Sequence, residues 1–177
     1  LQIEKSMTRS MDEKTYFNMI GQKTSSLIAT SCELGAITTT KKEEDRKAVY
    51  EFGHNLGTAF QIKDDLFDIT GSEFQTGKNS NSDVKKNMIT LPLIYAKSKM
   101  SRKQKRRLSQ LLKRKSKNKK TLSGIRELII EAGGIKYSID KMEEYSKLAI
   151  KAIEHYPNSL VKESLEDLVA FNSVRVK

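Results

Sequence analysis

The sequence predicts an all-α fold, and three observations support this class. Apolar residues recur at helical spacing over most of the 177-residue chain. Only two prolines, Pro92 and Pro157, interrupt the chain. No segment clearly alternates apolar with polar residues, and no Asn-Gly pair marks a hairpin. The length suits one domain with a proper core, so we expect residues 1–177 to form a single all-α domain.

Two helices are predicted before the middle of the chain. The first runs from Thr15 to Leu34 on the spacing of its apolar residues, and Gly35 is expected to end it. The second is long and runs from Glu43 to Ile69. The small residues of the second helix, which would let a neighbouring helix approach closely, are Gly53, Gly57 and Ala59. A polar stretch from Gly71 to Lys86, rich in Gly, Ser and Asn, predicts a loop.

Further helices follow this loop. The segment Thr90–Tyr95 begins the next helix, with Pro92 near its start. A short helix is expected from Leu122 to Ala132, where two glycines end it. Ile135–Glu154 has the pattern of an amphipathic helix, and Asn158–Val174 is expected to be the last one.

The positive charge of the chain is local. The net charge is +11, and thirteen of the 33 Lys and Arg lie between Lys97 and Lys120, where there is no acid. The other 20 face 22 Asp and Glu. The plain interpretation is a solvated pair of helical segments with a loop, Ser101–Leu112 and then Lys113–Lys120. A weak contact of residues 97–120 with an anionic membrane surface is an alternative. Nucleic acid is not the expected partner, because no aromatic residue in this segment could stack on bases.

The expected location is the cytoplasm. No apolar run is long enough to span a membrane, and the N-terminal residues do not form the apolar core of a signal peptide. The single cysteine, Cys32, cannot form an internal disulfide and is expected to be a buried, reduced thiol.

Three aspartates, Asp64, Asp65 and Asp68, lie within five residues at the end of an apolar helical run. On a helix, Asp64 and Asp68 are one turn apart on one face, where like charges cost about 0.2–0.5 kcal/mol. Bound Mg²⁺ would reverse this cost, since it takes oxygen ligands from one or two carboxylates and substrate phosphates. A solvated acidic helix end is the alternative, but acids there oppose the helix dipole. With Lys78 suited to a phosphate, the pattern predicts a diphosphate held through magnesium.

These residues resemble motifs of a known family. Residues 60–68 read FQIKDDLFD and resemble the second aspartate-rich motif of the trans-polyprenyl diphosphate synthases. Residues 23–27 and 32–36 look like the Lys-Thr helix of that family, and residues 77–93 look like the loop after the motif. Within that loop, the Thr-Leu-Pro-Leu of residues 90–93 is more similar to long-chain synthases, of octaprenyl or heptaprenyl type, than to farnesyl synthases.

The resemblance implies a prenyltransferase of the all-α isoprenoid synthase type. It implies that Asp64 and Asp68, with Asp65 in support, act on Mg²⁺ bound to an allylic diphosphate. The implied contacts to that diphosphate come from Lys23, Thr24, Gln61 and Lys78. The catalytic groups would be the three aspartates and Lys23, which stabilise the departing diphosphate during ionisation. Isopentenyl diphosphate would then add to the allyl cation and give a longer trans-polyprenyl diphosphate, and a homodimer is expected.

Two departures from the family pattern leave alternatives open. The first aspartate-rich motif and the basic isopentenyl diphosphate site of the family lie upstream and are not in these residues. The chain is therefore expected to be the C-terminal part of a longer synthase, lacking its N-terminal helices and inactive alone. The alternatives are a non-catalytic synthase subunit, and a basic helical module for anionic membrane or nucleic acid. The second departure is Met88, where the family usually has a lysine.

Overall fold

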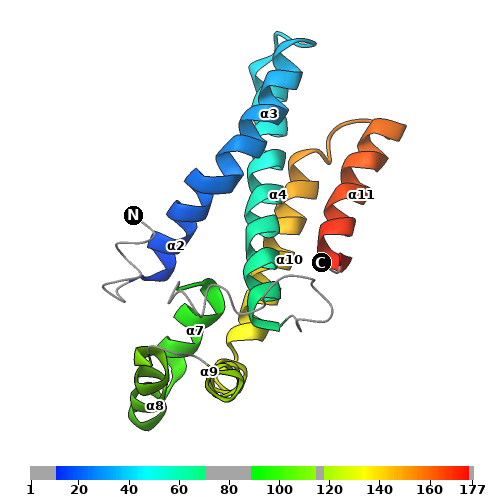
Figure 1. Cartoon of the computed structure of the whole chain (residues 1–177). Coiled ribbons are helices and arrows are strands. Elements are labelled where there is room, and N and C mark those ends of the chain that lie inside the picture. The colour runs from blue at the N-terminus through cyan, green and yellow to red at the C-terminus, as the bar shows by residue number, and fades with distance from the viewer. Residues whose placement is uncertain (1–10, 71–88, 115–117, 176–177) are drawn as a thin grey trace. The chain divides into compact units, whose positions relative to one another are not determined.

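The computed structural model describes residues 11–70, 89–114 and 118–175. Every regular element in these ranges is helical (Figure 1), which confirms the predicted all-α class. In chain order the elements are α2 (Glu13–Ile20), the π-helical turn η1 (Gly21–Ser25), α3 (Ser26–Ile37), α4 (Glu43–Thr70), α7 (Leu91–Lys99), α8 (Arg102–Lys113), α9 (Lys119–Glu131), α10 (Gly134–Ala152) and α11 (Leu160–Val174). The predicted loop from Gly71 to Lys86 lies outside the described residues.

The described residues divide into two compact units. Unit 1 holds the described residues of 11–16 and 64–139, and unit 2 holds residues 17–63 and 140–175. Along the chain, the division falls inside α4 and inside α10. None of the described helices combines the length and the apolar character needed to cross a membrane.

The predicted helix from Thr15 to Leu34 is present, but Gly35 does not end it. Helical structure continues to Ile37 at the end of α3. Gly35 is exposed, and a Cβ on it would meet nothing within 4 Å, so this glycine needs no special conformation. The helix ends instead at a run of threonines, where the Thr38 hydroxyl donates to the Gly35 carbonyl at 2.7 Å. Side-chain bonding to the last carbonyls therefore terminates α3 at Ile37, three residues after the predicted last residue, Leu34.

In unit 2 the backbones of η1 and α3 lie close against α4, along which they run in Figure 1. A Cβ on Gly53 would be 2.8 Å from the Cys32 sulfur, and one on Gly57 would be 2.7 Å from the Ser25 Cα. No side chain fits at either distance, so both glycines are needed for this packing. The prediction that small residues admit a neighbouring helix is thus confirmed at Gly53 and Gly57.

The core of unit 2 joins α4, α10 and α11. Its buried apolar residues are Phe52, Leu56, Ala149, Ile153 and Val169. At its edge, the Tyr156 hydroxyl donates to an Asp45 side-chain oxygen at 3.3 Å. Burial raises the pKa of Tyr156, and the Asp45 charge and this hydrogen bond raise it further. The phenol therefore stays protonated and holds the C-terminal side of α10 on α4.

In unit 1, α9 packs against both α7 and α8 (Figure 1). α7 begins at Leu91, one residue after the predicted start at Thr90, which is its N-cap residue. Ser101 caps the start of α8 through a capping box with Gln104. The predicted start of α9 at Leu122 is wrong by three residues. The Asn118 side chain accepts from the Thr121 amide at 2.9 Å and so starts the helix at Lys119.

The two glycines after α9 have different roles in unit 1. Gly133 has φ +76°, a left-handed conformation that suits a helix end. Gly134 begins α10, and a Cβ there would overlap the carbonyl oxygen of Pro92. The start of α10 is therefore packed directly on the first turn of α7. Beside this contact the rings of Tyr95 and Tyr137 stack with centroids 3.9 Å apart.

Candidate functional site

The three aspartates lie on the last turns of α4, in unit 1. Because α4 is continuous from Glu43 to Thr70, Asp64 and Asp68 are one turn apart and share a face, as predicted. Both side chains are half-buried. Asp65 differs, since it is only 6% exposed.

Asp65 accepts a hydrogen bond from a tyrosine of α2. The Tyr16 hydroxyl donates to Asp65 Oδ2 at 2.7 Å, and Tyr16 is fully buried. A short hydrogen bond from a phenol to a carboxylate oxygen fixes the rotamer of Asp65. This arrangement fits the supporting role expected for Asp65.

The sequence did not predict the hydrogen bond from Tyr16 to Asp65. A tyrosine at a buried helix position usually needs a hydrogen-bond partner for its hydroxyl. The sequence therefore indicated that Tyr16 would have such a partner if it were buried. The partner itself could not be named, because it lies 49 positions away.

In unit 2 the structure brings together two residues predicted to contact the diphosphate. The Thr24 hydroxyl donates to Gln61 Oε1 at 2.8 Å, although 37 positions separate them. This bond orients the Gln61 amide, so that its N–H groups are the donors it presents to other partners. Next to it, the Ser25 and Thr58 hydroxyls bond at 2.9 Å in the interior.

Lys23 lies in η1, one residue before Thr24, and its side chain is exposed. A single π-helical turn inside an α-helical run is a feature found often at functional sites. The packing of Ser25 on Gly57 and Thr58 holds this turn against α4. Lys78 and Met88, the other residues of interest for the diphosphate, lie outside the described residues.

Lys63 lies within the aspartate-rich segment but has a structural contact in unit 2. Its ammonium donates to the Ser173 carbonyl near the end of α11 at 2.8 Å. Burial lowers the pKa of Lys63, and the nearby Arg175 lowers it further. Arg175 in turn donates to the Phe60 carbonyl at 3.1 Å and lies over the Phe60 ring. Together these two cations fasten the end of α11 to α4.

The described residues of the site offer carboxylates to a metal ion but do not make a complete set of ligands. Within the described ranges, no three His, Cys, Asp or Glu side chains gather as ligands of one ion. Asp64 and Asp68 nevertheless share a helix face and offer only oxygen atoms. Magnesium keeps several waters and is held by one or two carboxylates together with substrate phosphates. The aspartate pair therefore fits a magnesium ion that arrives with a diphosphate, and does not fit a preformed protein cage.

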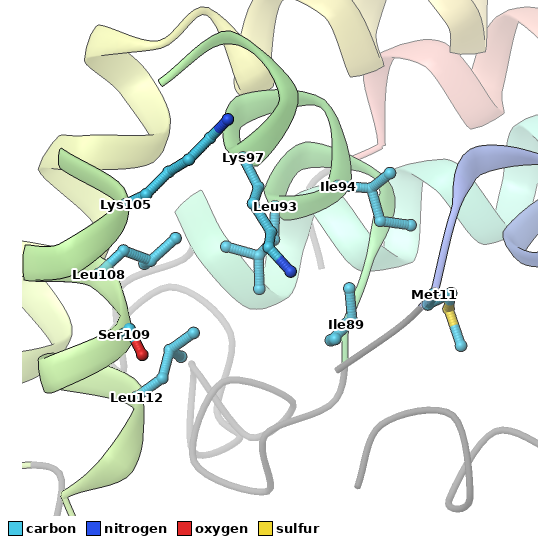
Figure 2. Close-up of a pocket in the computed structure, with 9 residues that line it drawn as sticks. All are labelled: Met11, Ile89, Leu93, Ile94, Lys97, Lys105, Leu108, Ser109 and Leu112. Atoms are coloured by element: carbon cyan, nitrogen blue, oxygen red, sulfur yellow. The ribbon is translucent and has the colours of Figure 1, made fainter. Parts of the chain in front are cut away.

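A cavity of about 100 Å³ lies elsewhere in unit 1, between side chains of α7 and α8 (Figure 2). Its walls are mainly apolar, with Leu93, Ile94, Leu108 and Leu112 among them, and two lysines, Lys97 and Lys105, also line it. Of the predicted site residues that the structure describes, none lines this cavity.

Comparison with known proteins relates the whole chain to one family. A family model described as "Polyprenyl synthetase" matches residues 1–129. Solanesyl diphosphate synthase 1, chloroplastic, of Arabidopsis thaliana is 34% identical over 154 residues, which are 87% of this chain and 37% of that protein. Heptaprenyl diphosphate synthase component 2 of Bacillus subtilis is 31% identical over 170 residues, 96% of this chain and 48% of that protein.

A solved structure extends the similarity to three dimensions. The polyprenyl synthase from Caulobacter crescentus, crystallised with calcium and isoprenyl diphosphate, matches with a TM-score of 0.91 and 28% identity. The match covers 99% of this chain and 54% of that one. The chain thus spans about a third to about half of the length of the proteins that it matches.

Proposed function

The chain belongs to the polyprenyl synthetase family, and from that premise we propose that it forms the C-terminal part of a trans-polyprenyl diphosphate synthase. It would supply the second aspartate-rich motif, Asp64 to Asp68, and the Lys-Thr turn. The observation that carries this proposal is the bond between Thr24 and Gln61. Both were expected to contact one diphosphate, and the fold joins them across 37 positions.

Each residue has a distinct proposed task. The ammonium group of Lys23 pairs with a phosphate of the diphosphate. Thr24 and Gln61 bind and orient the diphosphate through hydrogen bonds. Asp64 and Asp68 hold the metal on one face of α4, and Tyr16 keeps Asp65 in place beside them. The metal held by Asp64 and Asp68 would supply positive charge to neutralise the diphosphate as it departs.

The substrates proposed are an allylic diphosphate and isopentenyl diphosphate, and the product is a longer trans-polyprenyl diphosphate. The Caulobacter structure holds calcium and isoprenyl diphosphate. Calcium and magnesium are both hard cations that take oxygen ligands, so a pair of aspartates can coordinate either ion. We propose magnesium for this chain, because it demands fewer protein ligands than calcium does.

We also propose that residues 1–177 form the C-terminal portion of a single helical domain in a homodimer. Cytoplasmic location stays a prediction, and the similar Arabidopsis protein is described as chloroplastic. A second candidate function is a subunit that works only with a different partner chain. The relative from Bacillus subtilis, which is named as component 2 of its synthase, favours that candidate.

The role of Thr24 can be tested in the complete protein that contains this chain. Replacing Thr24 with alanine should raise KM for the allylic diphosphate by about tenfold, because one hydrogen bond to a charged group contributes about 1.5 kcal/mol. The change also removes the bond that orients Gln61.

The matched control is Ser26→Ala, two residues further along. The Ser26 hydroxyl is exposed and donates to the Gln22 carbonyl of the preceding turn, η1. This variant should keep the normal KM. If Thr24→Ala, Ser26→Ala and the unmodified protein had the same KM for the allylic diphosphate, Thr24 would not contact the diphosphate.

A further inference from the structure

Helix α8 presents a strongly basic face to solvent. The exposed cations of this basic face are Arg102, Lys103, Lys105, Arg106, Arg107 and Lys113. No Asp or Glu occurs between residues 97 and 120, and none of these six side chains forms an ion pair in the part of the chain that the structure describes. A hollow of the surface is lined by the first five of them and Gln110.

The other face of α8 is fixed on unit 1. Leu108 is 2% exposed, and Leu111 and Leu112 are half-buried. Figure 2 shows Leu108 and Leu112 at the cavity that faces α7. Because these leucines already pack inside the protein, α8 cannot insert them into another partner. Its free face can contribute only charge and hydrogen bonds.

The charges of the basic face lower the stability of α8 itself. Arg102 and Lys103 lie in the first turn, where cations oppose the helix dipole. Two pairs of like charges lie one turn apart and destabilise the helix, namely Arg102 with Arg106 and Lys103 with Arg107. A partner that carries negative charge would relieve both effects.

We propose that the basic face of α8 docks unit 1 on the surface of a membrane rich in anionic phospholipid. The six cations spread over one side of a helix match a flat surface of many headgroup charges. The absence of aromatic residues between 97 and 120 disfavours single-stranded nucleic acid. The choice of lipid also rests on the proposed function, because a long polyprenyl product has an apolar chain that requires a bilayer.

Vesicle flotation of the purified 177-residue chain tests this docking. The chain should float with phosphatidylcholine vesicles that contain 30% phosphatidylserine, and not with vesicles of phosphatidylcholine alone. Binding should fall steeply between about 0.1 M and 0.5 M salt, since surface charges are screened. Failure to float with the anionic vesicles at low salt would overturn the proposal.

A charge-neutralising variant locates the surface. The triple change Arg102→Gln, Lys103→Gln and Arg106→Gln should weaken vesicle binding about 100-fold, because each cation at an anionic surface contributes about fivefold. The helix should stay folded, as these changes remove unfavourable charges from its first turns. Circular dichroism checks that it does.

The matched control removes the same charge from exposed lysines of unit 2, as Lys47→Gln, Lys147→Gln and Lys151→Gln. It should bind vesicles almost as the unmodified chain does. Equal loss in both triple variants would show that only net charge matters and would overturn the assignment to α8. Tighter binding to a 20-base-pair RNA duplex than to the vesicles, at the same salt, would overturn the choice of lipid.

Different results would contradict the proposed docking and the proposed function. An Asp64→Ala variant should float like the unmodified chain, because Asp64 is not on the basic face. A complete protein that floats but makes no polyprenyl product contradicts the proposed function and leaves the docking surface intact. One that elongates without binding anionic vesicles contradicts the docking alone.

Discussion

Replacing Asp64 with alanine in the complete protein should lower the rate of elongation by about 10²-fold or more, which corresponds to about 2.7 kcal/mol of transition-state stabilisation. The carboxylate is half-buried on α4, one turn before Asp68. In the proposed site, its removal would leave one aspartate of the pair to hold the metal. The magnesium concentration needed for half-maximal rate should rise at the same time. Initial rates measured over a magnesium titration give both quantities.

The control for Asp64 is Asp167→Ala, which removes an exposed carboxylate from α11. That variant should elongate at the normal rate with the normal magnesium requirement. An Asp64→Ala protein that keeps full, magnesium-dependent activity would exclude this aspartate as a metal ligand. The magnesium requirement separates loss of the metal site from general damage to the fold.

The largest effect on stability is expected from Gly134→Ala. The added Cβ would overlap the Pro92 carbonyl oxygen and lie 2.9 Å from the Ile129 side chain. A backbone carbonyl at the start of α7 cannot yield as a flexible side chain does. The free energy of unfolding should fall by about 3 kcal/mol, which is at the upper end for overpacking of a core. Urea unfolding followed by circular dichroism measures it.

Gly35→Ala is the matched change at a glycine with open space. Gly35 lies in α3, and a Cβ there would meet nothing within 4 Å. Alanine should therefore raise stability by about 0.5–1 kcal/mol through its better helix propensity. If the Gly134→Ala variant were as stable as the Gly35→Ala variant, α10 would not pack as closely on α7 as the structure shows.

Helix positions followed from the sequence because apolar spacing reports which residues are buried. Helix ends were predicted less well. Gly35 resembled a helix-ending glycine, but threonine hydroxyls terminate α3. The start of α9 was placed at Leu122, whereas the Asn118 cap sets it earlier. Both errors arose because side-chain bonds to the backbone, rather than apolar spacing, determine where these helices stop and start.

The candidate site was predicted in parts. The spacing of Asp64 and Asp68 is a local property of a helix, so the sequence was enough to place them on one face. Thr24 and Gln61 came from resemblance to a family, and the fold joins them. The bond from Tyr16 to Asp65 could not be predicted, because it depends on how α2 packs on the end of α4. Contacts between residues far apart in the chain require the tertiary structure.

We propose that this chain completes a synthase that elongates an allylic diphosphate. An elongation assay tests this proposal by supplying farnesyl diphosphate, radiolabelled isopentenyl diphosphate and magnesium to two samples, the complete protein and the purified 177-residue chain. The complete protein should give a radiolabelled polyprenyl product longer than farnesyl. The chain alone should give none, because the first aspartate-rich motif and the second substrate site expected for the family are not among its residues. Elongation by the isolated chain, or no incorporation by the complete protein, would show that the proposal is wrong.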